Sequence, residues 1–316
     1  MPNISNDIRQ YYLNNLQQLP ADKQFHFASR LYLWNQSSDC RQLLDSLRAD
    51  FTAKGQPRVA LEQIIAQAKT SPVHGSKNAA ELRRPYFEAY PMLKTYVSVL
   101  FRIHFLKLIY GIDARQMLFE LFDRQDLEQL KHDLLADAQA LAILSTHAIN
   151  FLYLYERSVK QDETGLPVAR FLEIGHTQYD KANKLHLQLL VYLYTHCIIG
   201  ESLFYGRKLP TANLGLYQTM LQELEQLITS YYDDINLDNK CEFLVCARIA
   251  GLNFDELQGK IFAEASQSIS ADGTFLVDKH NNNPQTTNAD LDKSEHRNVL
   301  FIMANADFRP LVSLEA

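Results

Sequence analysis

A chain of 316 residues, of which 47% are hydrophobic and 22% charged, is long enough for one large domain or two ordinary ones and can bury a substantial core. The 37 acidic and 31 basic residues give a net charge of −6 and form no long block of one sign, so nucleic acid and anionic membrane surfaces are not expected partners. Glycine and proline are scarce, with 11 and 10 residues, which favours helices joined by short loops.

The four cysteines lack CxxC spacing and lie among apolar residues: Cys40, Cys197, Cys241 and Cys246. We therefore expect reduced, buried thiols in a cytoplasmic protein, without a disulfide. The first residues show neither the basic nor the apolar part of an export signal. The most apolar stretch, residues 185–200, is interrupted by His186, Gln188 and His196, so no membrane span is expected.

In chain order, the first helical pattern covers residues 43–51 and follows Ser37 and Ser38, which can cap a first turn. A second apolar stripe lies within residues 61–68. Residues 70–91 then contain three prolines and a glycine, which indicates a linker. The sequence thus predicts an N-terminal helical region, residues 1–80, and a second domain, residues 86–316.

Further helices are expected at residues 185–199, 217–228 and 254–265. The first is apolar on all sides and must be covered by other elements, whereas the other two carry one apolar face. Polar breaks are expected at residues 157–167 and 279–292, and the second is the best candidate for a mobile loop. A possible short pairing at residues 274–277 is the only strand-like feature.

Three apolar segments recur along the second half of the chain and begin at Asn183, Asn239 and Ser294. They are separated by steps of 56 and 55 residues, and amphipathic helices lie between them. This order predicts a repeat of helix pairs, stacked as an open superhelix or closed into a ring. If the segments are equivalent, Leu189, Val245 and Leu300 occupy matching buried positions.

The repeat step, the alternation of helix types and the turn ISADGTF at residues 269–275 resemble the α/α toroid of terpenoid cyclases, protein prenyltransferase β subunits and lanthionine cyclases. The resemblance covers residues 120–310. It implies an all-α ring of helix pairs, whose central cavity in those enzymes takes apolar, isoprenoid-like ligands. The glycine-rich turns and the DxDD-type acidic run of those enzymes are absent.

The same resemblance implies a zinc site. Prenyltransferases bind catalytic zinc with an aspartate, a cysteine and a histidine, which correspond here to Asp238, Cys241 and His296. Such a ligand set leaves a fourth zinc position open for a substrate or water. Asp238 and Cys241 are spaced as DNKC rather than DxC. The alternative is that Cys241 is a small buried residue and His296 a capping or exposed one.

His147 and His186 lie near the starts of apolar segments and are candidates for cofactor binding in a central cavity. The alternative for each is a hydrogen-bonded structural histidine. No nucleotide-binding, serine-hydrolase or zinc-protease motif occurs in the chain.

Two functions remain open. The first is a soluble helical-repeat protein that binds a peptide, a protein or an apolar small molecule. The alternative is a zinc-dependent transferase or cyclase of the toroid type.

Overall fold

The computed structural model describes residues 4–70, 77–277 and 290–312. In these ranges the protein is all-α, with sixteen α-helices, three short 3₁₀ helices, one π-helical segment and no strand. The predicted fold class is confirmed. Two isolated bridges join Arg207 to Val312 and Ile269 to Leu276, and the second lies at the short pairing expected near residues 274–277.

The chain folds as two compact units. Unit 1 combines Met1–Leu47 with Phe204–Ala316, and unit 2 is Arg48–Leu203. The boundary expected between residues 80 and 86 lies inside unit 2, within helix α5. The division by contacts therefore differs from the division by sequence, because the helices near the N-terminus pack against those near the C-terminus.

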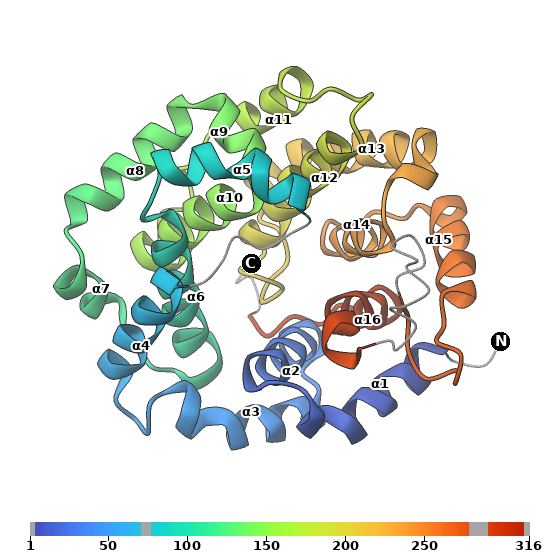
Figure 1. Ribbon diagram of the computed structural model, residues 1–316, viewed down its shortest axis with the longest axis horizontal. Coiled ribbons are helices and arrows are strands. Elements are labelled where there is room, and N and C mark those ends of the chain that lie inside the picture. Colours follow the sequence, from blue (N-terminus) through green and yellow to red (C-terminus); the bar gives the residue numbers. More distant parts are fainter. Residues whose placement is uncertain (1–3, 71–76, 278–289, 313–316) are drawn as a thin grey trace. The chain divides into compact units, whose positions relative to one another are not determined.

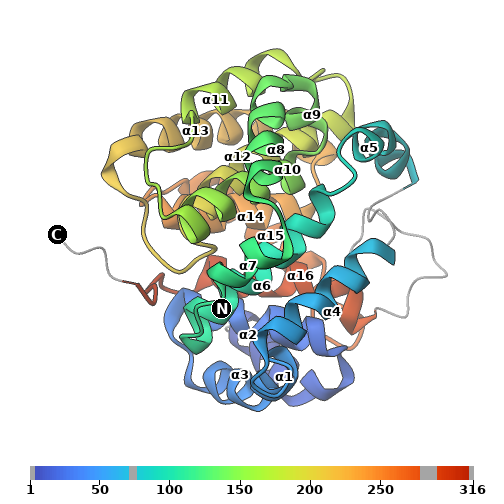
Figure 2. The ribbon, with the colours of Figure 1, turned by 90° about the vertical axis from the view of Figure 1, so that its left-hand side faces the viewer.

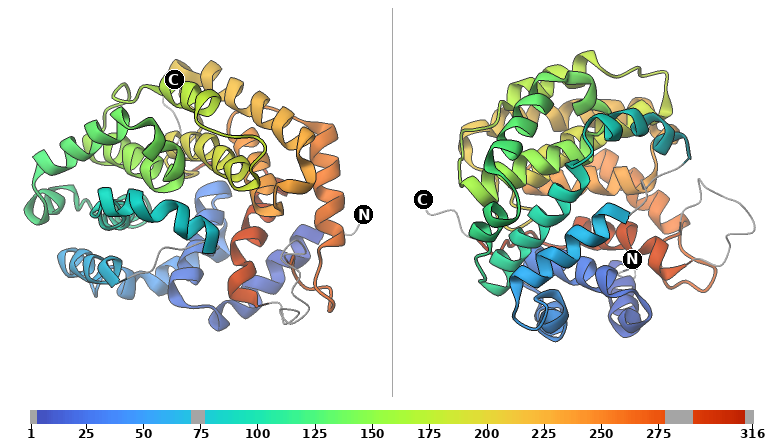
Figure 3. Two further views of the ribbon diagram at one scale, coloured as in Figure 1. Left: turned by 45° about the horizontal axis from the view of Figure 1, so that its top comes forward. Right: turned by 60° about the vertical axis from the view of Figure 1, so that its left-hand side comes forward.

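Unit 1 contains three helices that lie side by side in the order α2, α16, α14, with further helices packed against them (Figures 1 and 3). Helix α1 contacts α16 and also η1, the short helix that precedes α2. Helices α13 and α15 both contact α14. The helices of this unit are α1 (Ile4–Asn15), η1 (Leu16–Gln18), α2 (Ala21–Asn35), α3 (Ser38–Phe51, which continues into unit 2), η3 (Thr211–Asn213), α13 (Leu214–Ser230), η4 (Tyr232–Asp234), α14 (Leu237–Ile249), α15 (Asp255–Gln267) and α16 (Leu291–Asn305).

Unit 2 repeats this two-layer arrangement with α6, α10 and α12 side by side (Figure 1). Helix α4 packs on α6, α9 on α10 and α11 on α12, and α8 lies outside α10 (Figure 2). The helices of this unit are α4 (Pro57–Thr70), α5 (Lys77–Ala89), α6 (Leu93–Tyr110), α7 (Arg115–Leu121), α8 (Arg124–Ala136), α9 (Ala138–Ile143), α10 (Ser145–Tyr153), η2 (Leu154–Lys160), α11 (Val168–Thr177) and α12 (Lys184–Glu201).

The expected linker at residues 70–91 is largely wrong. Helix α5 occupies most of it and contains Pro85 in its interior, where proline removes one backbone donor without ending the helix. Residues 71–76 of this stretch lie outside the described residues. The polar break expected at residues 157–167 starts later, because Arg157 and Lys160 belong to the π-helical segment η2, which ends at Gln161 in a left-handed conformation (φ 57°).

The helix-pair order of the second half is confirmed, with a corrected register. Leu189, Val245 and Leu300 are all buried on α12, α14 and α16. The side chains that cap these helices are Asn183, Asn236 and Asp290. The helix starts are therefore 53 and 54 residues apart, and the expected start at Asn239 lies within the first turn of α14.

Three further predictions concern the cysteines, membrane spanning and a mobile loop. All four cysteines are free and buried. Among the described helices, none is long and apolar enough to cross a membrane. The mobile loop expected at residues 279–292 falls mostly on residues 278–289, which lie outside the described residues.

Candidate functional site

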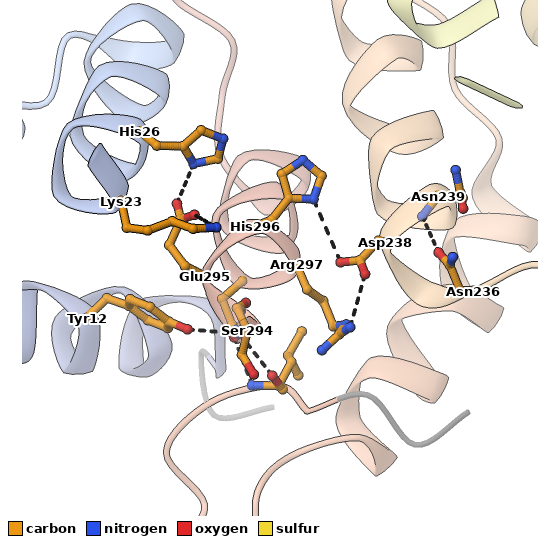
Figure 4. Close-up of polar contacts among 12 residues, drawn as sticks. Tyr12, Lys23, His26, Asn236, Asp238, Asn239, Ser294, Glu295, His296 and Arg297 are labelled. Carbon is orange, nitrogen blue, oxygen red and sulfur yellow. Dashed lines mark hydrogen bonds and ion pairs between the residues drawn. The ribbon is translucent and has the colours of Figure 1, made fainter. Parts of the chain in front are cut away.

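Two side-chain hydrogen bonds hold the N-terminus of helix α16. The Asp290 side chain caps this helix by accepting a hydrogen bond from the Asp292 N–H (3.1 Å). The hydroxyl of Tyr12, on α1, donates a hydrogen bond to the Leu291 carbonyl (3.1 Å). The neighbouring α14 starts in the same manner, with the Asn236 side chain accepting from the Asn239 N–H (2.9 Å; Figure 4). Because both helix starts are capped, the polar residues of their first two turns have defined positions.

The first pair of such residues bridges α14 and α16. Arg297 Nη2 lies 3.0 Å from Asp238 Oδ2, within hydrogen-bond distance. His296 Nδ1 lies 3.9 Å from Asp238 Oδ1, which is an ion-pair distance but too long for a hydrogen bond. The Asp238 and His296 side chains are 24% and 33% exposed, so both remain accessible to a ligand.

A second pair bridges α2 and α16. The Glu295 side chain is completely buried, and His26 Nδ1 lies 2.7 Å from Glu295 Oε1. Lys23 Nζ is 3.7 Å from the other carboxylate oxygen. An ionised carboxylate can only accept hydrogen bonds, so His26 Nδ1 must carry the proton, and Nε2 of the neutral ring is an acceptor.

The two histidines lie next to each other. Their ring centroids are 5.7 Å apart, with Glu295 below His26 and Asp238 below His296 (Figure 4). Neither Nε2 atom forms a hydrogen bond with any residue that the structure describes. We call this group the histidine cluster, and its members are Lys23, His26, Asp238, Glu295, His296 and Arg297.

Both carboxylates of the histidine cluster are held in the ionised form. Burial alone would raise the pKa of Asp238, but His296 and Arg297 hold it below its usual value. Burial likewise opposes ionisation of Glu295, and the neighbouring His26 and Arg30 lower its pKa. For His26, burial and the positive charge of Arg30 lower the pKa, while Glu295 opposes them. The cluster thus presents two carboxylates and a neutral His26 side by side near neutral pH.

The predicted zinc ligands are only partly brought together. His296 Nδ1 lies 3.9 Å from Asp238 Oδ1, but Cys241 is completely buried one turn further along α14. Burial raises the pKa of the Cys241 thiol well above its usual range, which disfavours the thiolate that zinc requires. Among the described residues, no group of three or more histidine, cysteine, aspartate or glutamate side chains is placed to hold a metal ion.

The two histidines predicted to bind a cofactor lie in unit 2, each with partners there. His147 of α10 contacts Thr146 Oγ1 (3.3 Å) and the edge of the Phe87 ring. His186, in the first turn of α12, accepts a hydrogen bond from the Asp180 N–H (3.1 Å) through Nδ1. Neither residue belongs to the histidine cluster.

Two residues of the histidine cluster, His26 and Glu295, were not predicted from the sequence. Glu295 precedes His296 in the segment SEHRN, and a run of polar side chains at the start of an otherwise apolar helix was the available signal. His26 lies about 270 residues earlier and shows no repeat relationship to α16, so only the fold reveals the pair.

Comparisons with protein families, curated proteins and solved structures find no match to this chain.

Proposed function

We propose that the protein binds a small polar ligand at the histidine cluster of unit 1. The observation that carries this proposal is the pair of imidazole rings, 5.7 Å apart, each backed by a carboxylate and each with an Nε2 atom that has no hydrogen-bond partner among the described residues. A ligand group that fits between the rings can hydrogen-bond to both Nε2 atoms. Buried charges that fix exposed polar groups are typical of binding sites.

The nature of the ligand follows from the polarity of the cluster. The sequence suggested a peptide, a protein or an apolar small molecule, held on a concave or axial surface. Charged and imidazole groups recognise polar ligands, because leaving them against an apolar surface would cost their hydration. The buried, free cysteines support the cytoplasmic location that we propose for this binding protein. The two-layer order of helices within each unit supports, at the level of fold, the resemblance to α/α toroids.

An enzyme is the second candidate, and one observation favours it. General acid–base chemistry uses a histidine oriented by a carboxylate, and the cluster holds two such pairs with different environments. In this alternative His26, kept neutral, accepts a proton, and His296 beside Asp238 donates one. It differs from the zinc-dependent transferase or cyclase suggested by the sequence, because it requires no metal. Turnover that is lost in both His26→Gln and His296→Gln would distinguish it from simple binding.

Histidine-ring NMR tests the binding proposal. The ten histidines of the chain can be labelled and their ring signals followed during titration with sugars, amino acids, organic acids and nucleotides. We expect at least one compound class to shift the signals of His26 and His296, assigned with His26→Gln and His296→Gln. Asp238→Asn should weaken this binding, whereas His132→Gln, at an exposed position on α8 in unit 2, should not. The proposal fails if no compound moves either ring, or if every binding event is unaffected by the three cluster variants.

A further inference from the structure

Arg30 of α2 lies one helical turn after His26 and therefore on the same face of the helix. Other arginines of unit 1 form ion pairs, such as Arg9 with Asp39 (2.9 Å) and Arg297 with Asp238 (3.0 Å). Arg30 forms no ion pair with any carboxylate of the described residues, and its buried Nε has no hydrogen-bond acceptor there. A buried Nε–H without an acceptor is costly, and a ligand with anionic oxygens would satisfy it.

The Arg30 guanidinium is supported from one side by Tyr205. The Arg30 Cζ atom lies 5.6 Å from the centre of the Tyr205 ring, and the ring also packs edge-on against Trp34. Tyr205 also shares a side-chain hydrogen bond with Arg30, which leaves the Nε–H and the remaining N–H groups of the guanidinium available for a ligand.

The backbone that presents Tyr205 is strained. Leu203, Phe204 and Tyr205 are three consecutive non-glycine residues with positive φ angles of 54°, 54° and 76°. Non-glycine residues in this conformation persist only where the surrounding packing enforces it. Phe204 and Tyr205 are both buried, and their packing holds the aromatic support of Arg30 in place.

The cations near the histidine cluster differ in their pairing. Lys23 lies 3.7 Å from Glu295 and Arg297 lies 3.0 Å from Asp238, whereas Arg30 forms no ion pair with either carboxylate. Arg30 acts electrostatically on both His26 and Glu295, so it belongs to the same local field. An anionic group of a ligand can pair with Arg30.

From this geometry we infer that the ligand is a small oxyanion that also carries a hydroxyl or amine group. The guanidinium fork of Arg30 binds the carboxylate or phosphate oxygens, and Nε2 of His26, an acceptor, takes a hydrogen bond from the hydroxyl or amine. The inference rests on the proposed function, because it names the class of ligand for the same site.

Four related probes separate the contributions of the two ligand groups. Glycerol phosphate and glycerate combine an oxyanion with hydroxyls, inorganic phosphate lacks the hydroxyls, and glycerol lacks the charge. We expect glycerol phosphate or glycerate to shift the His26 ring signal and to bind at least about tenfold more tightly than glycerol, the range expected for a charge-assisted hydrogen bond. The tighter of the two acids identifies a phosphate or a carboxylate as the preferred group.

Arg30→Gln should remove this preference for anions, with a loss of about tenfold or more in affinity for the acids and little change for glycerol. The matched control is Arg41→Gln, on α3 of the same unit, whose guanidinium already pairs with Asp45 (2.8 Å). If Arg30→Gln does not fold, Arg30→Lys retains the charge without the planar fork and should still weaken binding of the acids severalfold.

Two results would overturn the inference. Either neither acid binds wild-type protein more tightly than glycerol does, or the Arg30 variants bind the acids as wild type does. If uncharged compounds still shift the His26 and His296 rings in either case, the proposed function stands and only the anionic ligand class is wrong. If no compound of any class shifts these rings, the proposed function itself has failed.

Discussion

Asn298 and Leu276 form two hydrogen bonds with each other: the Asn298 side-chain oxygen accepts from the Leu276 N–H (2.8 Å), and its amide donates to the Leu276 carbonyl (3.0 Å). The same amide also donates to the Ser294 carbonyl and contacts the Tyr12 hydroxyl. One buried side chain therefore joins the turn after α15 to α16 and α1, next to the histidine cluster.

Asn298→Ala should lower the free energy of unfolding by about 2–3 kcal/mol, because it leaves the N–H and carbonyl of Leu276 without partners in the interior. The control is Asn305→Ala at the end of the same helix, where the amide donates only to the Phe301 carbonyl near the surface. Urea denaturation of both variants measures the difference. Equal stability of the two would show that the turn is not anchored through Asn298.

Leu189→Ala and Leu300→Ala should each destabilise the protein by about 2–5 kcal/mol, and Val245→Ala by less, because each leaves a cavity in a closely packed helix. His186→Ala, on the same helix as Leu189, should cost about 1 kcal/mol or less because it removes one hydrogen bond and one ring contact at a half-exposed helix start. Thermal melts of the four variants provide the comparison. A melt of Leu189→Ala close to wild type would contradict the packing of α12.

Zinc content tests the metal site suggested by the toroid resemblance. Because Cys241 is buried and no suitable ligand group occurs among the described residues, protein purified without a metal-affinity tag should contain no stoichiometric zinc. A chelator should not change its melting temperature, and Cys241→Ser should respond to the chelator as wild type does. Zinc at one equivalent per chain, lost in both Cys241→Ser and His296→Gln, would restore the predicted site.

Acid should destabilise unit 2 through His104. This side chain is buried on α6 with Nδ1 2.8 Å from Ser158 Oγ, and burial lowers its pKa to about 4. In the unfolded chain the pKa of His104 is about 6.5, so between pH 6.5 and pH 4 the unfolded state binds the proton more readily than the folded state does. The free energy of unfolding therefore falls as the pH falls through this range. This residue alone should cost about 2 kcal/mol between pH 7 and pH 5.

The measurement is urea denaturation at the two pH values. His104→Gln should lose less stability than wild type on acidification, whatever its stability at pH 7. His132→Gln, at an exposed position, serves as the control and should keep the wild-type pH dependence. A wild-type pH dependence in His104→Gln would show that His104 is not the group responsible.

Helix faces were the part of the fold that sequence predicted best. The apolar stripe on α13 coincides with its buried residues, because each of its apolar positions faces one neighbouring surface. Helix starts were less accurate. Asn239 and Asn236 both suit a cap, and only the structure shows that Asn236 accepts the capping hydrogen bond. The helix at α5 was missed because Pro85 and the residues before it resemble a linker in composition.

Part of the candidate site was predictable from the sequence, and the difference between the two parts has a physical reason. Asp238 lies in the first turn of α14 and His296 in the second turn of α16, and these repeated helices lie side by side, so the repeat brings the two residues close together. His26 and Glu295 meet through a contact between α2 and α16, which no periodicity in the sequence encodes. Cys241 fits the expected spacing but not the expected environment, since accessibility depends on which helices cover α14.

Unit 1 is assembled from two distant parts of the chain, and this affects the order of events during synthesis. Unit 2 is continuous, so it can complete its core as soon as residue 203 has left the ribosome. Helix α2 emerges before all of unit 2, yet its main partner α16 is translated some 260 residues later. The apolar face of α2 that packs on α16 therefore lacks its native cover through most of translation.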